Sequence, residues 1–274
     1  MRIFKYLALF MALISLNTCS KKTTGANHNK GFSNTLRVMS YNVHHCNPPS
    51  KPGFIDVNAV AMAIKEQHPD LVAVQEIDVN TVRSGKINEA SQIARITGMN
   101  MYFAKSIDTD GGDYGVLILS KFPISEMTTH RLPTDESTKG EHRVLATAKV
   151  TLPSGKQIRF GCTHLDAQRT ETNRLLQIAE INRLAGMEKL PFIMAGDLNS
   201  RPGSAVINLL DEKFSRTCSS CGFTIPVINP KSTIDFVTYL QKDRFNVISH
   251  EVVQERYASD HLPVLSVIQF IPKP

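Results

Sequence analysis

The chain has 274 residues, of which 42% are hydrophobic and 20% are charged. This composition excludes the fibrous and intrinsically disordered classes, and the length suits one large α/β domain or two small ones. The net charge of +6 favours an anionic partner such as nucleic acid, phospholipid or a phosphorylated metabolite, although the basic residues form no concentrated run.

The N-terminus has the pattern of an export signal. A positively charged start is followed by an apolar stretch at residues 6–16 and by Cys19. The stretch is shorter than the roughly twenty residues that a membrane-spanning helix needs. Its end resembles a bacterial lipoprotein signal, which is cleaved before an acylated cysteine. Thr18 departs from the small residue usual at that position, so plain secretion is the alternative.

The chain is therefore expected to have three parts: a lipoprotein signal peptide at residues 1–18, a flexible tether at 19–34 and one catalytic domain at 35–274. Residues 20–34 are small, polar and without periodicity, which is typical of a tether. No second linker or repeat follows Leu36. We expect an exported protein of the cell envelope, lipid-anchored through Cys19 and monomeric, with no protein partner evident.

Within the domain, short apolar runs alternate with amphipathic stretches. In chain order we expect a strand at 36–43, a helix at 57–67, a strand at 71–75, a helix at 88–97 that ends at Gly98, strands at 114–119, 142–150 and 157–162, a helix at 168–184, and strands at 192–195, 234–239, 244–249 and 263–270. Consecutive strands without helices between them argue against a purely parallel sheet. The pattern predicts an α/β fold with two packed mixed sheets flanked by helices.

Four cysteines follow Cys19 along the chain. Cys218 and Cys221 are separated by two serines, and no further ligands stand at the spacing of a zinc site. An exported protein meets an oxidising compartment, so we favour a local disulfide between them over zinc, with two free thiols as the remaining alternative.

Polar, acidic or imidazole residues stand at the ends of one predicted strand after another, where α/β folds place reactive groups. They are Asn42, Glu76, His164, Asp166, Asp197, Asn199, Asp235, Asp260 and His261. Each alone has a structural explanation, since carboxylates cap helices and single histidines are often structural. Six such clusters in one domain favour a shared site.

These side chains also indicate the chemistry. Carboxylate and amide oxygens without cysteine suit a hard divalent cation, for which we expect Mg²⁺, with Mn²⁺ or Ca²⁺ as alternatives. A cation with several carboxylates and two histidines is suited to cleaving phosphoesters.

Seven segments in order resemble those of the endonuclease/exonuclease/phosphatase superfamily. They are Ser40–Val43, Gln75–Glu76, Gly115–Ser120, Thr163–Asp166, Gly196–Asn199, Ile234–Phe236 and Ser259–Pro263. The Gly-Asp-x-Asn and Ser-Asp-His-x-Pro motifs are the most specific. The resemblance implies a four-layered sandwich, two face-to-face β-sheets with helices on both outer sides.

The resemblance also implies roles. Glu76 is similar to the main metal-binding carboxylate, with Asn42 and Asp260 near the ion. Asp197 is similar to the residue that orients or activates the attacking water or stabilises the leaving oxygen, and Asn199 to a donor to a phosphate oxygen.

Further roles follow from the same resemblance. His261 is similar to an imidazole paired with Asp235. The remaining residues fall on the substrate side: His164 as a second phosphate contact, Asp113 as its acidic partner, and Arg143 and Asp166 as substrate-binding residues.

Two departures from the family pattern stand out. His44 occupies a position where abasic-site endonucleases carry an aspartate, so an auxiliary metal contact is absent or altered. The DNA-gripping insertions and aromatic wedges of those enzymes are not evident, and the chain has no Trp.

The favoured function is a metal-dependent phosphodiesterase or phosphatase acting on nucleic acid, a phospholipid head group or an inositol phosphate. The alternative is a non-catalytic surface-binding lipoprotein that retains the fold. A metalloprotease is disfavoured, because the chain lacks a His-Glu-x-x-His helix.

Overall fold

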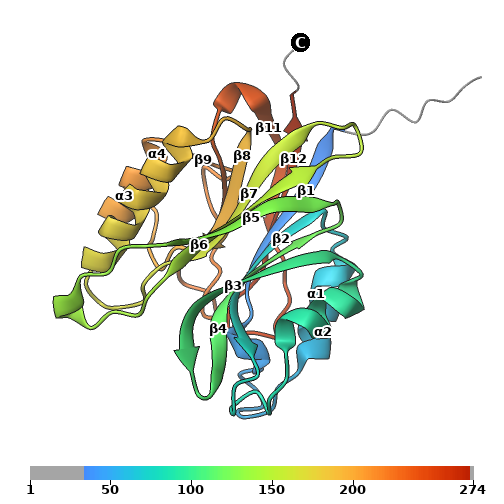
Figure 1. Cartoon of the computed structure of the whole chain (residues 1–274), viewed down its shortest axis with the longest axis vertical. Coiled ribbons are helices and arrows are strands. Elements are labelled where there is room, and N and C mark those ends of the chain that lie inside the picture. The colour runs from blue at the N-terminus through green and yellow to red at the C-terminus, as the bar shows by residue number, and fades with distance from the viewer. Residues whose placement is uncertain (1–33, 272–274) are drawn as a thin grey trace, which may run out of the picture. The chain divides into compact units, whose positions relative to one another are not determined.

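Two six-stranded β-sheets pack face to face in the computed structural model, which describes residues 34–271 (Figure 1). The first sheet has the order β11-β12-β1-β2-β4-β3. Its strands are β1 (Thr35–Asn42), β2 (Leu71–Val79), β3 (Asn100–Thr109), β4 (Gly112–Ser120), β11 (Phe245–Val252) and β12 (Val264–Phe270).

The second sheet has the order β5-β6-β7-β8-β10-β9. Its strands are β5 (Ile124–Arg131), β6 (Val144–Thr151), β7 (Gln157–His164), β8 (Phe192–Asp197), β9 (Ser215–Arg216) and β10 (Asp235–Tyr239). Each sheet contains one parallel pair, β1 with β2 and β7 with β8, among antiparallel pairs. The predicted α/β sandwich of two mixed sheets is confirmed.

Helices cover the outer face of each sheet (Figure 1). α1 (Val57–Glu66) and α2 (Glu89–Thr97) pack on the first sheet, and α3 (Thr172–Met187) and α4 (Ala205–Asp211) pack on the second. Short 3₁₀ turns lie at His44–Cys46, Glu136–Thr138 and Lys242–Arg244.

Local signals set the helix boundaries. The side chain of Asp56 accepts a hydrogen bond from the Ala59 N–H at the start of α1, and Asn88 does the same for Ser91 at the start of α2. α2 ends at Gly98, as predicted, because this residue has the left-handed φ of 71° that glycine adopts without strain.

Three apolar layers form the core. One fills the space between the sheets and includes Phe160 and Ile268, and the other two lie under the helix pairs. Burial of these layers is the main favourable contribution to folding. The interior strands of both sheets carry the apolar runs, which is why the sequence revealed them.

Four elements were not expected: β3, β5, β9 and α4. β3, β5 and β9 are edge strands. No residue of β5 is buried and six of the eight are exposed, so β5 lacks an apolar run. The helix expected at 168–184 begins at Thr172 instead. The residues before it form a loop in which Asp166 accepts a hydrogen bond from the Gln168 N–H.

Cys218 and Cys221 form the expected local disulfide, and Cys46 and Cys162 are buried free thiols. Among residues 34–271, no helix is both long and apolar enough to cross a membrane. The predicted signal peptide, Cys19 and all but the last residue of the predicted tether lie outside the described residues.

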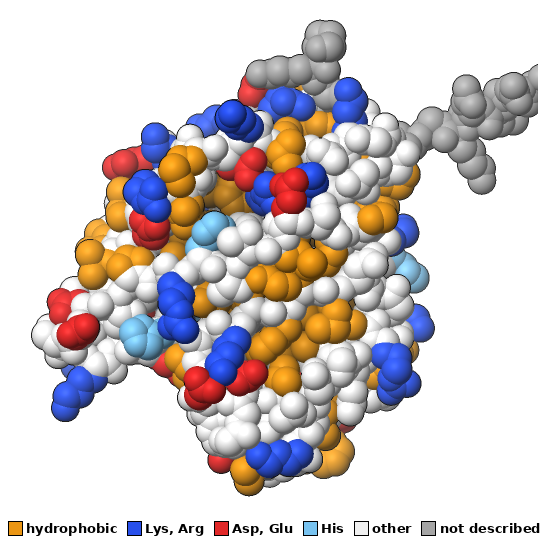
Figure 2. Space-filling view, in the orientation of Figure 1, with side chains coloured by type: hydrophobic (Ala, Val, Ile, Leu, Met, Phe, Trp, Pro, Cys, Tyr) orange, Lys and Arg blue, Asp and Glu red, His pale blue; other side chains and the backbone are white. Residues whose placement is uncertain are grey.

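Lysine and arginine side chains are scattered among acidic ones on the face drawn in Figure 2, without a single basic patch. On this face, therefore, the net positive charge offers no concentrated electrostatic surface for a polyanion.

Candidate active site

Strand register brings the predicted residues to one end of the sandwich. In the second sheet, His164 at the end of β7 pairs with Asp197 at the end of β8, and Asp197 pairs with Asp235 at the start of β10. In the first sheet, Asn42 at the end of β1 pairs with Gln75, the residue before Glu76. Adjacent strands therefore place these side chains side by side.

The amide of Asn42 joins the two sheets. Its Nδ2 donates to Glu76 Oε1 and to Asp197 Oδ2, both at 3.0 Å. Glu76 lies where the pairing of β2 with β4 is interrupted, between Val74 and Ile77, and its φ is 61°. A bulge of this kind redirects a side chain out of the regular alternation. Here it accompanies the turn of Glu76 toward Asn42.

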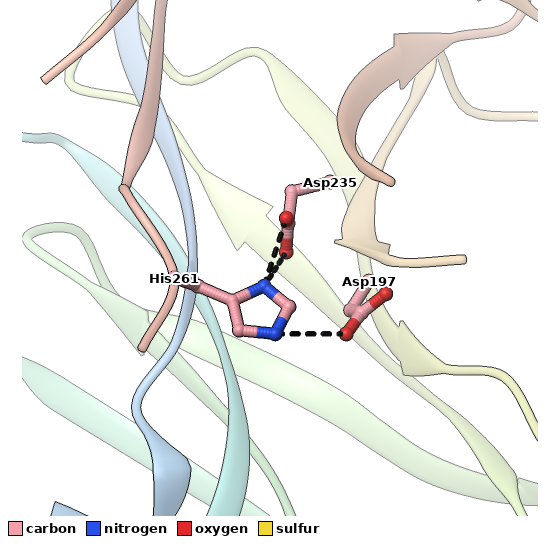
Figure 3. Close-up of side chains that lie close together, drawn as sticks. All are labelled: Asp197, Asp235 and His261. Atoms are coloured by element: carbon pink, nitrogen blue, oxygen red, sulfur yellow. Dashed lines mark hydrogen bonds and ion pairs between the residues drawn. The ribbon is translucent and has the colours of Figure 1, made fainter. Parts of the chain in front are cut away.

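His261 lies between two aspartates, as Figure 3 shows. Its Nδ1 is 2.9 Å from Asp235 Oδ2, and its Nε2 is 3.8 Å from Asp197 Oδ2. The expected pairing of Asp235 with His261 is confirmed. All three residues are buried, with 5% exposure or less, so their charges interact without much screening by water.

Burial and charge shift the pKa values in this group in opposite directions. Burial, together with the negative charge of Asp235, raises the pKa of Asp197 to about 7. Burial by itself would lower the pKa of His261, but the nearby carboxylates of Asp235 and Asp197 outweigh it and raise this pKa to about 10. The site thus holds an imidazolium next to a carboxyl group that titrates near neutral pH.

His164 forms the other flank of Asp197. Arg143 Nη1 donates to His164 Nδ1 at 2.9 Å, and burial, with the Arg143 charge, lowers the pKa of His164 well below its usual range. The ring is therefore neutral, with its proton on Nε2. That nitrogen lies 3.6 Å from Asp197 Oδ2 and 3.1 Å from Asn199 Nδ2.

The expected pairing of Asp113 with His164 is wrong. His164 Nδ1 accepts from Arg143 and its Nε2 lies 3.6 Å from Asp197 Oδ2, whereas Asp113 Oδ1 lies 2.8 Å from Lys105 Nζ. The first residues of β4 form a hairpin with β3. This hairpin places Asp113 beside Lys105 of the neighbouring strand.

The remaining candidates take different positions. Asp260 is at the rim, with a side chain 37% exposed and Oδ1 4.0 Å from His261 Nε2. Asn199 donates its backbone N–H to Asp197 Oδ1 at 2.8 Å. Asp166 is buried and holds the loop after β7 through the Gln168 N–H, so the structure shows it supporting a loop instead of joining the central cluster.

Close contacts within each sheet fix the strand ends at the site. Ser259 Oγ donates to the Asn42 carbonyl at 2.7 Å, which ties the segment before β12 to the end of β1. A Cβ at Gly196 would lie 2.1 Å from the Thr163 carbonyl oxygen, so only glycine allows β8 to approach β7 here.

Sequence reasoning missed His45, whose Nδ1 lies 3.6 Å from Glu76 Oε2. The available signal was its place three residues after Asn42, beside His44. The motif comparison drew attention to His44 alone.

Three carboxylate or imidazole groups among residues 34–271 have ligand atoms within 4.8 Å of one another: Asp197, Asp235 and His261. His261 Nδ1 is already engaged by Asp235, so this nitrogen is not free to bind an ion.

Comparison with known proteins agrees with this geometry. The model described as the Endonuclease/Exonuclease/phosphatase family matches residues 39–274. A curated Schizosaccharomyces pombe protein, inositol phosphosphingolipids phospholipase C, is 27% identical over 183 residues, which are 61% of this chain. The match spans only 42% of the length of that relative.

Two solved structures share the fold. An endonuclease/exonuclease/phosphatase from Beutenbergia cavernae has a TM-score of 0.71 and 21% identity, with 86% of this chain and 72% of that one covered. A mannosyl-6-phosphatase from Bacteroides thetaiotaomicron has a TM-score of 0.70 and 16% identity, with 86% of this chain and 100% of that one covered.

Proposed function

Because the chain belongs to the endonuclease/exonuclease/phosphatase family, a family of phosphoester hydrolases, we propose that it is a divalent-metal-dependent phosphodiesterase or phosphatase. One observation carries the proposal. Asp197 accepts a hydrogen bond from the same amide that binds Glu76, while His261 and its partner Asp235 lie on its other side. Proton-handling and cation-binding groups therefore meet at one point.

The side chains on the Glu76 side fit a hard cation. Glu76 and Asp197 are two carboxylates bridged by one neutral amide, that of Asn42; Asp197 is buried, and the Glu76 side chain is 21% exposed. A divalent cation would neutralise this charge, and Mg²⁺ prefers such oxygen ligands. We assign the ion to Glu76, with Asn42 and Asp260 beside it. When bound, it supplies electrostatic stabilisation of the charge that develops on the phosphate.

The chain's own residues account for the proton transfers. Asp197 has a pKa raised to about 7, close to the value that suits a general base at neutral pH, so it is suited to orient the attacking water and take its proton. His261, held as an imidazolium by Asp235, stabilises negative charge on the phosphate. Neutral His164, with Asn199, donates hydrogen bonds to other phosphate oxygens.

Among substrates, we place a phospholipid head group first, ahead of inositol phosphates and nucleic acid. The curated relative is by name a phospholipase C that acts on inositol phosphosphingolipids. The proposed lipid anchor would hold the site beside such substrates. The absence of Trp and of DNA-gripping insertions argues against a repair nuclease.

A panel assay tests the proposal. Purified protein is incubated with phospholipids, inositol phosphates, RNA and DNA, with Mg²⁺, Mn²⁺ or Ca²⁺ or with excess chelator. We expect cleavage of at least one phosphoester that chelator abolishes. The matched controls are D197N at the site and D211N at a partly buried ion pair with Arg216. If no phosphoester is cleaved by a folded protein with any of these ions, the fold is retained for binding alone.

We also propose that the protein is exported and anchored by lipid on Cys19. The support is the sequence pattern of residues 1–19. Mass spectrometry of the protein from its native membrane should find an acylated Cys19 as the first residue, and C19S should release the protein from the membrane fraction. An unmodified N-terminus, or residues retained before Cys19, would contradict the anchor.

A further inference from the structure

His45 faces Glu76 but forms no hydrogen bond with it. Its Nδ1 lies 3.6 Å from Glu76 Oε2, beyond ordinary hydrogen-bond length. Among the described residues this buried nitrogen has no hydrogen-bond partner, and the side chain is only 20% exposed. A buried polar atom without a partner is costly, so its occurrence beside a carboxylate of the site points to a missing ligand.

The backbone is strained where it presents this ring. His44, His45 and Cys46 have φ values of 46°, 41° and 54°, in the left-handed region that non-glycine residues avoid. Each such residue costs about 1–2 kcal/mol. Strain of this kind persists where the surroundings enforce it and is concentrated at functional sites.

Contacts around the turn do enforce it. The Cys46 N–H donates to the Val43 carbonyl at 2.8 Å, the Asp56 N–H donates to the Cys46 carbonyl at 2.7 Å, and the Cys46 side chain is fully buried. The direction of the His45 ring is therefore set by a packed turn and does not depend on a free loop.

His44, the neighbouring residue, is engaged elsewhere. Its Nδ1 lies 2.9 Å from the Asn47 carbonyl oxygen, and its backbone N–H donates to Asn42 Oδ1 at 3.0 Å. Two adjacent histidines thus have different roles: His44 closes the turn, and His45 faces Glu76.

We propose that His45 Nδ1 is a nitrogen ligand of the same divalent ion that Glu76 binds, and that it makes the site prefer a transition ion such as Mn²⁺ over Mg²⁺. This inference rests on the proposed function, because it takes Glu76 as the metal carboxylate. It also explains what stands in for the aspartate absent at position 44.

The separation of the two atoms agrees with this role. Protein nitrogen and oxygen ligands bind such ions at about 2.0–2.2 Å. Two ligand atoms at these distances, at angles between 90° and 120°, lie about 2.8–3.8 Å apart. The observed 3.6 Å is near the upper end of this range. The same separation is longer than an ordinary hydrogen bond, which leaves His45 Nδ1 available to an ion.

The nitrogen also has a consequence for ion selection. Magnesium is bound mainly through oxygen and keeps several waters, whereas imidazole suits transition ions. A site with oxygen ligands alone would accept Mg²⁺ and Mn²⁺ with little distinction. One imidazole added to Glu76 should favour Mn²⁺.

The test compares the wild-type protein with H45N and H44N. Asparagine tolerates the left-handed backbone and keeps an amide oxygen, but it has no ring nitrogen. Mn²⁺ binding is measured by electron paramagnetic resonance titration, with Mg²⁺ as competitor. Nitrogen coupling to the bound Mn²⁺ is measured by electron spin echo envelope modulation. Neither readout requires turnover.

For H45N we expect the ratio of Mn²⁺ to Mg²⁺ affinity to fall about tenfold or more, the scale of losses at metal sites when a supporting group is removed. The nitrogen coupling should be lost as well. H44N should keep both. A nitrogen coupling that persists in H45N, or an unchanged affinity ratio, would overturn the proposal, because the nitrogen would then come from His164 or His261.

H45G serves as a second variant if H45N does not fold, since glycine adopts the left-handed turn without strain. Failure of the proposed function and failure of the His45 assignment give different results. Loss of nitrogen coupling in H45N, with no phosphoester cleaved by the wild type, would contradict the proposed function alone. Cleavage by the wild type with coupling unchanged in H45N would contradict the His45 assignment alone.

Discussion

Glu89 is an acid whose burial should make the fold less stable at high pH. Its side chain is fully buried at the start of α2 and next to Cys46. Glu89 Oε2 accepts a hydrogen bond from the Asp78 N–H at 2.8 Å. Burial, with the negative charge of Asp78, raises the pKa of Glu89 to about 8.

The direction of the pH dependence of stability follows from how many protons the folded and unfolded states bind. An unfolded glutamate has a pKa of about 4.3. Between that value and pH 8 the folded state keeps the proton that the unfolded state releases, so stability falls as pH rises. Each pKa unit corresponds to about 1.4 kcal/mol. The cost is therefore about 1 kcal/mol at pH 5 and about 5 kcal/mol at pH 9.

The variant E89Q removes this titration. Glutamine has the same size and keeps an acceptor oxygen for the Asp78 N–H, but it stays neutral. We expect E89Q to gain stability relative to wild type as pH rises, by about 4 kcal/mol between pH 5 and pH 9.

The assay is urea unfolding followed by circular dichroism from pH 5 to pH 9 in excess chelator, which excludes metal effects. The control E180Q changes a glutamate in a surface pair with Arg183. A stability difference between E89Q and wild type that does not change with pH would refute the reasoning, since Glu89 would then titrate alike in both states.

Three further predictions concern the site. D197N should lower the rate of phosphoester cleavage about a hundredfold or more and leave the fold intact, because it removes the proposed base. E76Q should weaken metal binding, so that higher Mg²⁺ or Mn²⁺ partly restores activity. G196A should destabilise the fold by about 3 kcal/mol or more in urea unfolding, because its Cβ would lie 2.1 Å from the Thr163 carbonyl oxygen.

Each has a result that would contradict it. Near wild-type cleavage by folded D197N would mean that another group activates the water. If E76Q loses activity and no metal concentration restores it, Glu76 has a role other than metal binding. Unchanged stability of G196A would show that β7 and β8 separate without cost.

The sequence determined the interior of the fold and most of the site. The interior strands had to bury apolar side chains, and this left continuous runs that mark β1, β2, β4, β7 and β8. Reactive residues follow these runs directly, because strand ends are where a rigid scaffold meets an open loop. Asn42, Glu76 and Asp197 were therefore identifiable before any coordinates, and His261 was identifiable from its place just before the last strand.

Only the tertiary structure decided which residues meet. The edge strand β5 carries no apolar run, because six of its eight residues are exposed and none is buried. The partner of Asp113 depends on the hairpin of β3 with β4, which brings it to Lys105 and away from His164.

The different roles of His44 and His45 were also not predictable from the sequence alone. The two residues are chemically identical neighbours, and no spacing rule separates them. Three successive left-handed residues turn His45 toward Glu76 and leave His44 to close the turn. That conformation is held by packing around Cys46 and by contacts with the chain ten residues later, at Asp56. Backbone direction at a strained turn depends on such contacts, so it is decided only when the whole domain is folded.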